Sequence, residues 1–469
     1  MSRLIVISNR VSAGGGSAGG LAVALTAALR KNGGIWFGWS GEQTDEFTGH
    51  INFQIEDGVR TATIDLEEQD IDEYYNGYAN RTLWPLFHYR IDLAEYERSF
   101  AGGYARVNER FADTVLPLVE PTDLIWVQDY HMLPLGEKLR ARGVRNRIGC
   151  FLHIPWPPRR LLMTLPEARE LVESLFAYDV LGFHTDEWLE SFVSFVRDEL
   201  GGTVGDDNVA HWNGRALQLV ACPVGIDAQE FSMLAASETA QQTYTRVRES
   251  AVGRTLMVGV DRLDYSKGLE ERFLGYERFL TETPKARKEV VLLQIAPPSR
   301  GAVESYQRIR NTLEGLAGRI NGEHAWLDWV PIRYVNHGYP RDVLAGVYRA
   351  SKIGLVTPLR DGMNLVAKEY VAAQDPEDPG VLILSRFAGA AVQLTDAILV
   401  NPHSAEEISD AMRQALAMPL DERKRRWQRM MRSVQDEDVM WWLDRFTAAL
   451  EGRDDAPQPE VPQNLVVLR

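Results

Sequence analysis

Short apolar runs rich in β-branched residues alternate with amphipathic stretches along nearly the whole chain. In the first half, apolar runs at 4–8, 124–129 and 180–185 precede helical patterns near 21–31, 132–142 and 187–200. The pattern restarts with runs at 256–260, 290–296 and 353–358, which precede expected helices at 270–282, 303–320 and 365–374. Continuous apolar strands with helical crossovers are typical of parallel sheets covered on both faces, so an α/β fold is predicted.

A polar helical stretch at 237–250 separates the two halves and indicates a connection between domains. We therefore expect two Rossmann-like doubly wound domains, 1–235 and 236–450, that face each other across a cleft. Ligands of such sheets bind at the carboxyl ends of the strands, where functional residues should gather. The acidic, proline-containing tail at 451–469 has no periodicity and is expected to be disordered.

Composition narrows the class of protein. The 469 residues include 51 Lys+Arg and 66 Asp+Glu, for a net charge of −15 without a basic block, which argues against nucleic acid as a partner. No apolar run approaches the roughly 18 residues of a membrane span, and no export signal is visible. Cys150 and Cys222 lie in apolar strand-like runs, so buried thiols and a cytoplasmic location are expected.

The loop after the first strand is rich in glycine and contains Arg10 at the strand end. Gly14, Gly16 and Gly19 formally match the dinucleotide motif G-x-G-x-x-G, which would indicate a nicotinamide-dependent oxidoreductase. That motif normally begins directly after its strand, whereas here several residues intervene. A phosphate-binding loop is therefore favoured, and a surface linker is the structural alternative.

A second strand end carries two cations on one strand-to-helix loop, Arg262 and Lys267. In an acidic protein this pair suggests a diphosphate site at which side chains neutralise the charge of a leaving group. The alternative is an ion pair with Asp261 or Asp264 that only closes the turn.

A third strand end reads TPLRDGMNLVAKE. Asn364 is expected to cap the following helix, so that its amide and those of Leu365 and Val366 would face the same diphosphate. The carboxylates of Asp361 and Glu369 could accept hydrogen bonds from sugar or ribose hydroxyls. Their alternative roles are a helix-dipole partner and a solvated helix face, respectively.

Two loops of the first half carry Asp129, His131 and His153 at or just beyond strand ends. A lone histidine is more often packed than catalytic, although convergence on one cleft favours function. Neither paired histidines nor a Cys/His cluster has metal-ligand spacing, so no metal site is expected. Asp70 and Asp72 form a D-x-D sequence in a helix-like stretch and are predicted to be solvated.

Aromatic side chains could supply a sugar platform beside these loops. Tyr75 and Trp84 are of the types that stack on sugar rings, although most aromatics belong to the core. Arg300 follows the apolar run at 290–296 and, with Arg10, would form a second anion site. Two anion sites in one cleft indicate a nucleotide-sugar donor and a phosphorylated acceptor.

The sequence resembles glycosyltransferase family 20, the trehalose-6-phosphate synthases, over most of its length. The resemblance rests on SNRVSAGGGSAGGL, GGIWFGWSG, DEYYNGYAN, LWPLFHYR, WVQDYHMLPL, FLHIPWP, GVDRLDYSKGL, QIAPPSRG, RINGEH and TPLRDGMNLVAKEYVAAQ. It implies a GT-B fold whose terminal helix returns to the first domain. It also implies metal- and cofactor-independent transfer of glucose from UDP-glucose to glucose 6-phosphate with retained configuration, giving α,α-trehalose 6-phosphate and UDP.

The resemblance also implies roles for individual residues. Those expected to contact the donor are Gly19, Gly20, Arg262, Lys267, Tyr339, Asp361, Asn364, Leu365, Val366, Ala367, Lys368 and Glu369, with Tyr339 beside the base and Glu369 on the ribose. The acceptor set is Arg10, Tyr75, Trp84, Asp129 and Arg300, in which the arginines hold the phosphate. The expected catalytic residues are Arg262, Lys267, Asp361, His153 and Asp129.

The chain departs from the family pattern at a few positions, and alternatives stay open. Gln128 replaces a histidine, Trp156 replaces a phenylalanine, and the first loop is short and glycine-rich. A relative that uses glycerol 3-phosphate as acceptor, and a non-catalytic sugar-phosphate sensor, are the alternatives within this fold. A homo-oligomer, either a dimer or a tetramer, is also compatible with the resemblance.

Overall fold

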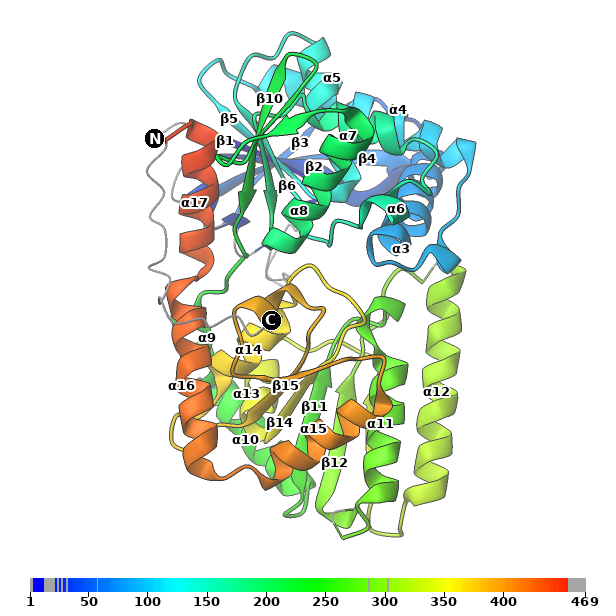
Figure 1. The fold of residues 1–469 in the computed structure, drawn as a ribbon, viewed down its shortest axis with the longest axis vertical. Coiled ribbons are helices and arrows are strands. Elements are labelled where there is room, and N and C mark those ends of the chain that lie inside the picture. The colour runs from blue at the N-terminus through cyan, green and yellow to red at the C-terminus, as the bar shows by residue number, and fades with distance from the viewer. Residues whose placement is uncertain are drawn as a thin grey trace.

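The computed structural model describes residues 3–453 except 12–21, 23–24, 27, 31–32, 57, 286 and 302. Within these residues the strands form two sheets, stacked end to end in Figure 1, with helices on both faces of each. This arrangement confirms the predicted α/β class with two doubly wound units. Of the helix expected near 21–31, residues 22, 25–26 and 28–30 are described, and all of these are helical.

The first sheet has the strand order β3-β4-β2-β1-β5-β6-β7-β10-β9-β8. Its strands are β1 (Leu4–Arg10), β2 (Gly34–Thr44), β3 (Asn52–Glu56), β4 (Val59–Glu67), β5 (Leu124–Gln128), β6 (Ile148–Phe151), β7 (Val180–Phe183), β8 (Thr203–Val204), β9 (Val209–Trp212) and β10 (Arg215–Ala221). The central strands are parallel, as predicted, whereas β3 and the β8–β9–β10 edge pair antiparallel. The edge strands β3, β8 and β9 have only two to five residues each, too few for the sequence pattern to predict them.

The second sheet is parallel throughout, in the order β13-β12-β11-β14-β15-β16. Its strands are β11 (Thr255–Val260), β12 (Val290–Ile295), β13 (Ile332–Val335), β14 (Ile353–Val356), β15 (Val381–Ser385) and β16 (Ile398–Val400). This is the Rossmann order 3-2-1-4-5-6, whose direction reverses between β11 and β14. The loops after these two strands carry Arg262, Lys267 and Asp361, which is where such sheets bind ligands.

Helices cover both sheets. Around the first sheet lie α2 (Glu68–Asp70), a π-helical segment (Ile71–Leu83), α3 (Trp84–Phe87), α4 (Arg98–Val115), α5 (Leu135–Ala141), α6 (Arg159–Leu162), α7 (Ala168–Leu175) and α8 (Asp186–Phe195). Around the second lie α9 (Ala228–Ala235), α10 (Glu238–Ser250), α11 (Leu269–Glu282), α12 (Glu304–His324), α13 (Arg341–Ala350), α14 (Leu365–Ala373), α15 (Ala405–Ala417) and α16 (Leu420–Asp436). The helices expected at 270–282 and 365–374 match α11 and α14 to within one residue, and α12 extends one turn further than predicted.

The last helix, α17 (Val439–Glu451), leaves the second sheet and packs against the first. The ring of Phe446 stacks on Trp126 of β5 at 4.8 Å, and Arg147 Nε donates to the carbonyl of Leu450 at 2.5 Å. Figure 1 shows α16 and α17 running in succession along one side of both units. Residues 454–469, most of the expected disordered tail, lie outside the described residues.

Both cysteines are buried and free, as predicted. Burial of apolar side chains is also continuous where the pattern predicted strands, for example at Ile5, Val127 and Leu355. Among the described residues, no helix is both long and apolar enough to cross a membrane.

The prediction that Asp70 is solvated is wrong. Its carboxylate is fully buried and accepts a hydrogen bond from Arg106 Nε at 2.9 Å and another from Arg110, both on α4. Asp72 is exposed, because residues two apart on a helical segment point in different directions. The sequence pattern missed the ion pairs because their arginines lie some 36 to 40 positions away.

Asp70→Asn is expected to lower the free energy of unfolding by about 3 kcal/mol, the low end for a broken buried ion pair, because both arginines keep partial solvent contact. Denaturant unfolding followed by circular dichroism measures this change. The matched Asp72→Asn control should stay within about 0.5 kcal/mol of the parent protein. Equal stability of the two variants would contradict a structural role for the Asp70 ion pairs.

Candidate active site

The carboxyl ends of the two sheets meet. Arg300, after β12, donates from Nη2 to the hydroxyl of Tyr130, after β5, at 3.2 Å. Gly362, after β14, lies against the backbone that follows β6, where an added Cβ would come within 1.9 Å of the carbonyl oxygen of His153. Only glycine allows so close an approach, so this position ties the two loops together.

On the second-sheet side, Lys267 and Asp361 form a buried ion pair, with Nζ and Oδ2 2.5 Å apart. Asn364 Nδ2 donates to the same oxygen at 3.1 Å. This network holds the lysine ammonium in a fixed position at the carboxyl end of β11.

Arg262 is exposed, and in the described part of the chain it forms no ion pair. Its guanidinium carbon lies 5.8 Å from the centre of the Trp84 ring. The turn-closing alternative is wrong for both aspartates, because Asp261 pairs with Arg272 and Asp264 with Arg300. Arg262 is therefore available to an anion.

The start of α14 differs in one respect from the prediction. Asn364 occupies the N-cap position with φ 72°, but its side chain turns to Asp361 and does not cap the helix. Its Oδ1 is buried and has no hydrogen-bond partner within the described residues. A left-handed backbone points the side chain away from the first turn, which leaves the first amides of α14 open.

Two further residues of α14, Lys368 and Glu369, do not both point toward the loops that carry the candidate site. The Nζ of Lys368 is fully buried and donates to the carbonyl of Val224 at 2.7 Å, so the side chain points away from the loop cluster. Glu369 is only partly exposed, which contradicts the solvated-face alternative. Burial raises the pKa of its carboxyl to about 6, against the opposing charge of Arg341. The remaining donor candidate, Tyr339, is partly buried beside His337.

On the first-sheet side, Asp129 and His153 lie together. Asp129 has φ 72° and accepts a hydrogen bond from the backbone N–H of His153 at 3.0 Å. Burial raises the pKa of Asp129 to about 6, and the nearby charges of Arg300 and Arg262 oppose that shift. Burial also lowers the pKa of His153 to about 3, so its ring is neutral at physiological pH. The Gln128 side chain contacts His153 Nε2 at 2.8 Å.

Aromatic rings connect the remaining acceptor candidates. The Arg300 guanidinium lies 3.8 Å from the ring centre of Trp84 and donates a hydrogen bond to the hydroxyl of Tyr306. Tyr75 stacks on His131 at 6.1 Å and meets Trp39 edge-on at 5.5 Å. Arg10 is exposed at the end of β1, 5.7 Å from the Trp39 ring. Gly19 and Gly20 lie outside the described residues.

Sequence reasoning missed several residues of this cluster. The hydroxyl of Tyr130 accepts a hydrogen bond from Arg300 and donates one to Asn80. The hydroxyl of Tyr306 donates to Asp264 at 2.9 Å. The position of Tyr130 between Asp129 and His131 could have identified it. Tyr306 lies within a helix, and no local pattern marks its contact with a distant loop.

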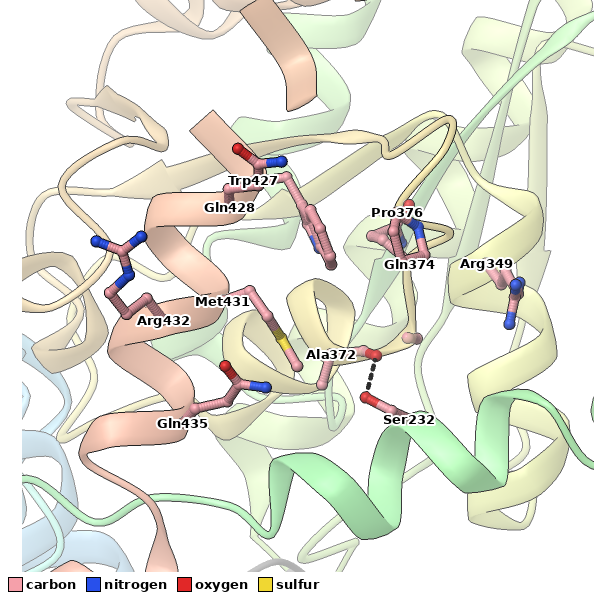
Figure 2. Close-up of a pocket in the computed structure, with 11 residues that line it drawn as sticks. Ser232, Arg349, Ala372, Gln374, Pro376, Trp427, Gln428, Met431, Arg432 and Gln435 are labelled. Atoms are coloured by element: carbon pink, nitrogen blue, oxygen red, sulfur yellow. Dashed lines mark hydrogen bonds between the residues drawn. The ribbon is translucent and has the colours of Figure 1, made fainter. Parts of the chain in front are cut away.

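A cavity of about 490 Å³ lies away from this cluster, between α9, α16 and the carboxyl end of α14. Figure 2 shows Trp427, Met431 and Gln435 projecting from α16 toward Ala372. Ser232 donates to the Ala372 carbonyl at 3.0 Å, and the indole of Trp427 donates to Val371. None of the predicted site residues lines this cavity, so it is not the candidate active site.

Possible metal ligands gather elsewhere. Among the described residues, a group close enough to share an ion consists of Glu277, within α11, and Glu323 and His324, at the end of α12. Arg319 already pairs with Glu277, with both nitrogen–oxygen distances at or below 2.7 Å. This group is unrelated to the loop cluster.

Two Rossmann-like sheets whose carboxyl ends meet, with cationic side chains on both sides of the junction, are the arrangement expected of a GT-B glycosyltransferase. The model of the family described as glycosyltransferase family 20 matches residues 7–452, and the chain belongs to that family. A trehalose-6-phosphate synthase of Sinorhizobium fredii is 49% identical over 97% of this chain and 99% of its own. The oxidoreductase alternative is therefore wrong.

Solved structures agree with this assignment. An α,α-trehalose-phosphate synthase (UDP-forming) of Burkholderia xenovorans, solved in complex with glucose-6-phosphate, is 47% identical with a TM-score of 0.94, covering 96% of this chain and all of its own. An E. coli structure with UDP-2-fluoro glucose bound is 44% identical with a TM-score of 0.93, covering 97% of this chain and 100% of its own. The likeness thus extends over both sheets.

Proposed function

We propose that this enzyme transfers glucose from UDP-glucose to glucose 6-phosphate and releases α,α-trehalose 6-phosphate and UDP. The observation that carries the proposal is a pair of cationic sites at the junction of the two sheets. Arg262 and Lys267 lie at the second sheet, and Arg300 lies against Trp84 of the first. The ligands named for the Burkholderia xenovorans and E. coli structures, glucose-6-phosphate and UDP-2-fluoro glucose, support the same two substrates.

The cations stabilise the charge that develops on the donor diphosphate. As the bond between the anomeric carbon and the phosphate oxygen breaks, negative charge accumulates on UDP. Arg262 is free to approach it, and Asp361 keeps the Lys267 ammonium in place. Side-chain charges fixed before the reaction lower the barrier because they need no reorganisation.

Retention of configuration needs no carboxylate nucleophile in this scheme. The acceptor hydroxyl attacks on the face that UDP leaves, and its proton passes to an oxygen of the departing phosphate. Asp129, ionised above pH about 6, accepts hydrogen bonds from the acceptor sugar, and the neutral ring of His153 contacts the transferred glucose. Orientation and charge stabilisation then supply the rate without a metal ion.

Most acceptor contacts come from the first sheet and most donor contacts from the second, with Arg300 after β12 among the exceptions. We place the boundary between them at 222–227, because α9, which the sequence assigned to the first domain, packs against α13 and α14. Residues 228–436 then form the body of the donor domain, and α17 returns to the acceptor domain.

UDP release from UDP-glucose, with and without glucose 6-phosphate and in the presence of EDTA, tests the proposal. Acceptor-dependent release in EDTA, with a product that becomes a trehalase substrate after dephosphorylation, is expected. Release with glycerol 3-phosphate instead would overturn the acceptor assignment. Donor binding without release for any acceptor would favour the non-catalytic sensor, and loss of activity in EDTA would contradict metal independence.

The carboxylate of Glu369 should give the reaction an acid limb. Below pH about 6 this group is protonated and loses capacity to accept hydrogen bonds from the ribose, so kcat/KM for UDP-glucose should fall as the pH drops. Initial rates at saturating glucose 6-phosphate, between pH 5 and 8, measure this profile. Glu369→Gln should have a lower plateau and a flatter acid limb, and an unchanged limb in that variant would assign the titration to another group.

A further inference from the structure

The backbone of the described chain passes between the two sheets at two places that touch each other. One crossing is the segment 222–227 between β10 and α9, and the other is the junction of α16 and α17. A Cβ added to Gly225 would lie 2.2 Å from the carbonyl carbon of Asp438, so the two crossings are in direct contact. The backbone N–H of Val439 also donates to the carbonyl of Ile226 at 3.3 Å. Adjacent chain crossings of this kind form a hinge about which one unit can rotate against the other.

Val224, in the first crossing, is held by one side chain from each unit. Its backbone N–H donates to Nδ1 of His184, which follows β7 of the first sheet, at 3.3 Å. Its carbonyl accepts a hydrogen bond from Nζ of Lys368, on α14 of the second sheet, at 2.7 Å. All three residues are buried, so water cannot replace either bond without opening the core.

Lys368 belongs to the helix whose first amides face the proposed donor site. The helix begins at Leu365, directly after Asn364 and the Lys267–Asp361 ion pair. A buried ammonium is costly, and burial lowers the pKa of Lys368 to about 7, with Glu437 of the second crossing opposing the shift. Desolvation of the ammonium costs more free energy than one hydrogen bond to a carbonyl contributes. The burial of Lys368 is explained if its link to the crossing at Val224 serves the reaction.

We propose that Lys368 is a positioning residue that links the donor-binding end of α14 to the chain crossing at Val224, so that donor binding sets the angle between the two units. This inference rests on the proposed function, since it assumes that UDP-glucose binds at α14. Lys368 itself does not contact the donor through its side chain. Its effect passes through the backbone of Val224, and the closure it supports brings His153 of the first sheet to the transferred sugar.

Lys368→Met tests the proposal, because it keeps the length of the side chain but removes the ammonium that donates a hydrogen bond to Val224. UDP binding is followed by calorimetry, UDP-induced compaction by the radius of gyration from X-ray scattering, and turnover by UDP release. We expect the compaction to be lost and kcat to fall about tenfold or more, while the Kd for UDP changes less than about threefold. Lys424→Met, which removes a lysine paired with Glu377 on the surface of α16, is the matched control and should behave as the parent protein.

Lys368→Gln serves as a second variant should the methionine variant unfold at the assay temperature. Its amide stops short of the Val224 carbonyl, so the same loss of compaction is expected. Normal compaction with kcat within about twofold of the parent would overturn the proposal. So would a parallel loss of UDP affinity and kcat with normal compaction, which would make Lys368 a donor ligand, or the absence of compaction in the parent protein. A parent enzyme that compacts with UDP but forms no product would instead refute the proposed function alone.

Discussion

Arg262→Ala is expected to lower kcat for glucose transfer by about 10³-fold, because it removes a preorganised cation from the departing diphosphate. The side chain is exposed and forms no ion pair within the described residues, so the melting temperature should change much less than in Arg300→Ala. UDP release at saturating substrates and a thermal melt measure the two effects. The effect on the reaction should exceed the effect on donor binding, because negative charge on UDP is greatest in the transition state.

Two further variants define what Arg262 contributes. Arg262→Lys keeps a positive charge and should recover part of the lost rate, although a lysine cannot reproduce the planar fork of a guanidinium. Arg308→Ala removes an exposed arginine of α12, paired with Glu304, and should leave turnover unchanged. Normal turnover by Arg262→Ala would refute the diphosphate assignment.

Arg300→Ala is expected to raise KM for glucose 6-phosphate by about 100-fold, the equivalent of about 2–3 kcal/mol for hydrogen bonds to a charged phosphate. The guanidinium is nearly buried between Trp84, Tyr130 and Tyr306, so it is already oriented before substrate binds. A preorganised arginine loses little entropy on binding a phosphate. Initial-rate kinetics with varied glucose 6-phosphate measure the change.

The same substitution should also destabilise the protein, because Asp264 loses a partner. Burial alone would raise the pKa of Asp264, yet Arg300, Lys267 and Arg262 together hold it at about 2. Without Arg300 the carboxylate remains buried with less compensation, so the melting temperature should fall. An unchanged Kd for UDP would separate this acceptor effect from general unfolding. If KM for glucose 6-phosphate stays within about threefold, Arg300 has a structural role only.

Much of the fold could be predicted from the sequence. Apolar runs and amphipathic stretches depend on local periodicity, and they located the central strands and the helices α11 and α14 closely. The antiparallel strands β3, β8 and β9 were not predicted, because segments of two to five residues are too short for a periodic pattern to be recognised. The π-helical segment at 71–83 lies where a helix-like pattern was recognised, but the pattern did not indicate π winding or the packing of the segment against α4.

The candidate site was predictable where chemistry follows a strand end. Arg262, Lys267 and Asp361 were found in this way, and the structure brings the last two into one ion pair. The partners of these residues were not predictable. Tyr306 contacts Asp264 from a helix some 42 positions away, and only the folded chain brings them together.

The sequence alone determined the α/β class, the repeated strand–helix pattern and the residue types at each loop, because these depend on neighbours within a few positions. The tertiary structure decided which charges are free and which are already paired. Asp70 is buried by two arginines, Lys368 turns to Val224, and Arg262 remains open to an anion. Such choices depend on desolvation and on contacts between distant segments, and local sequence carries no record of either.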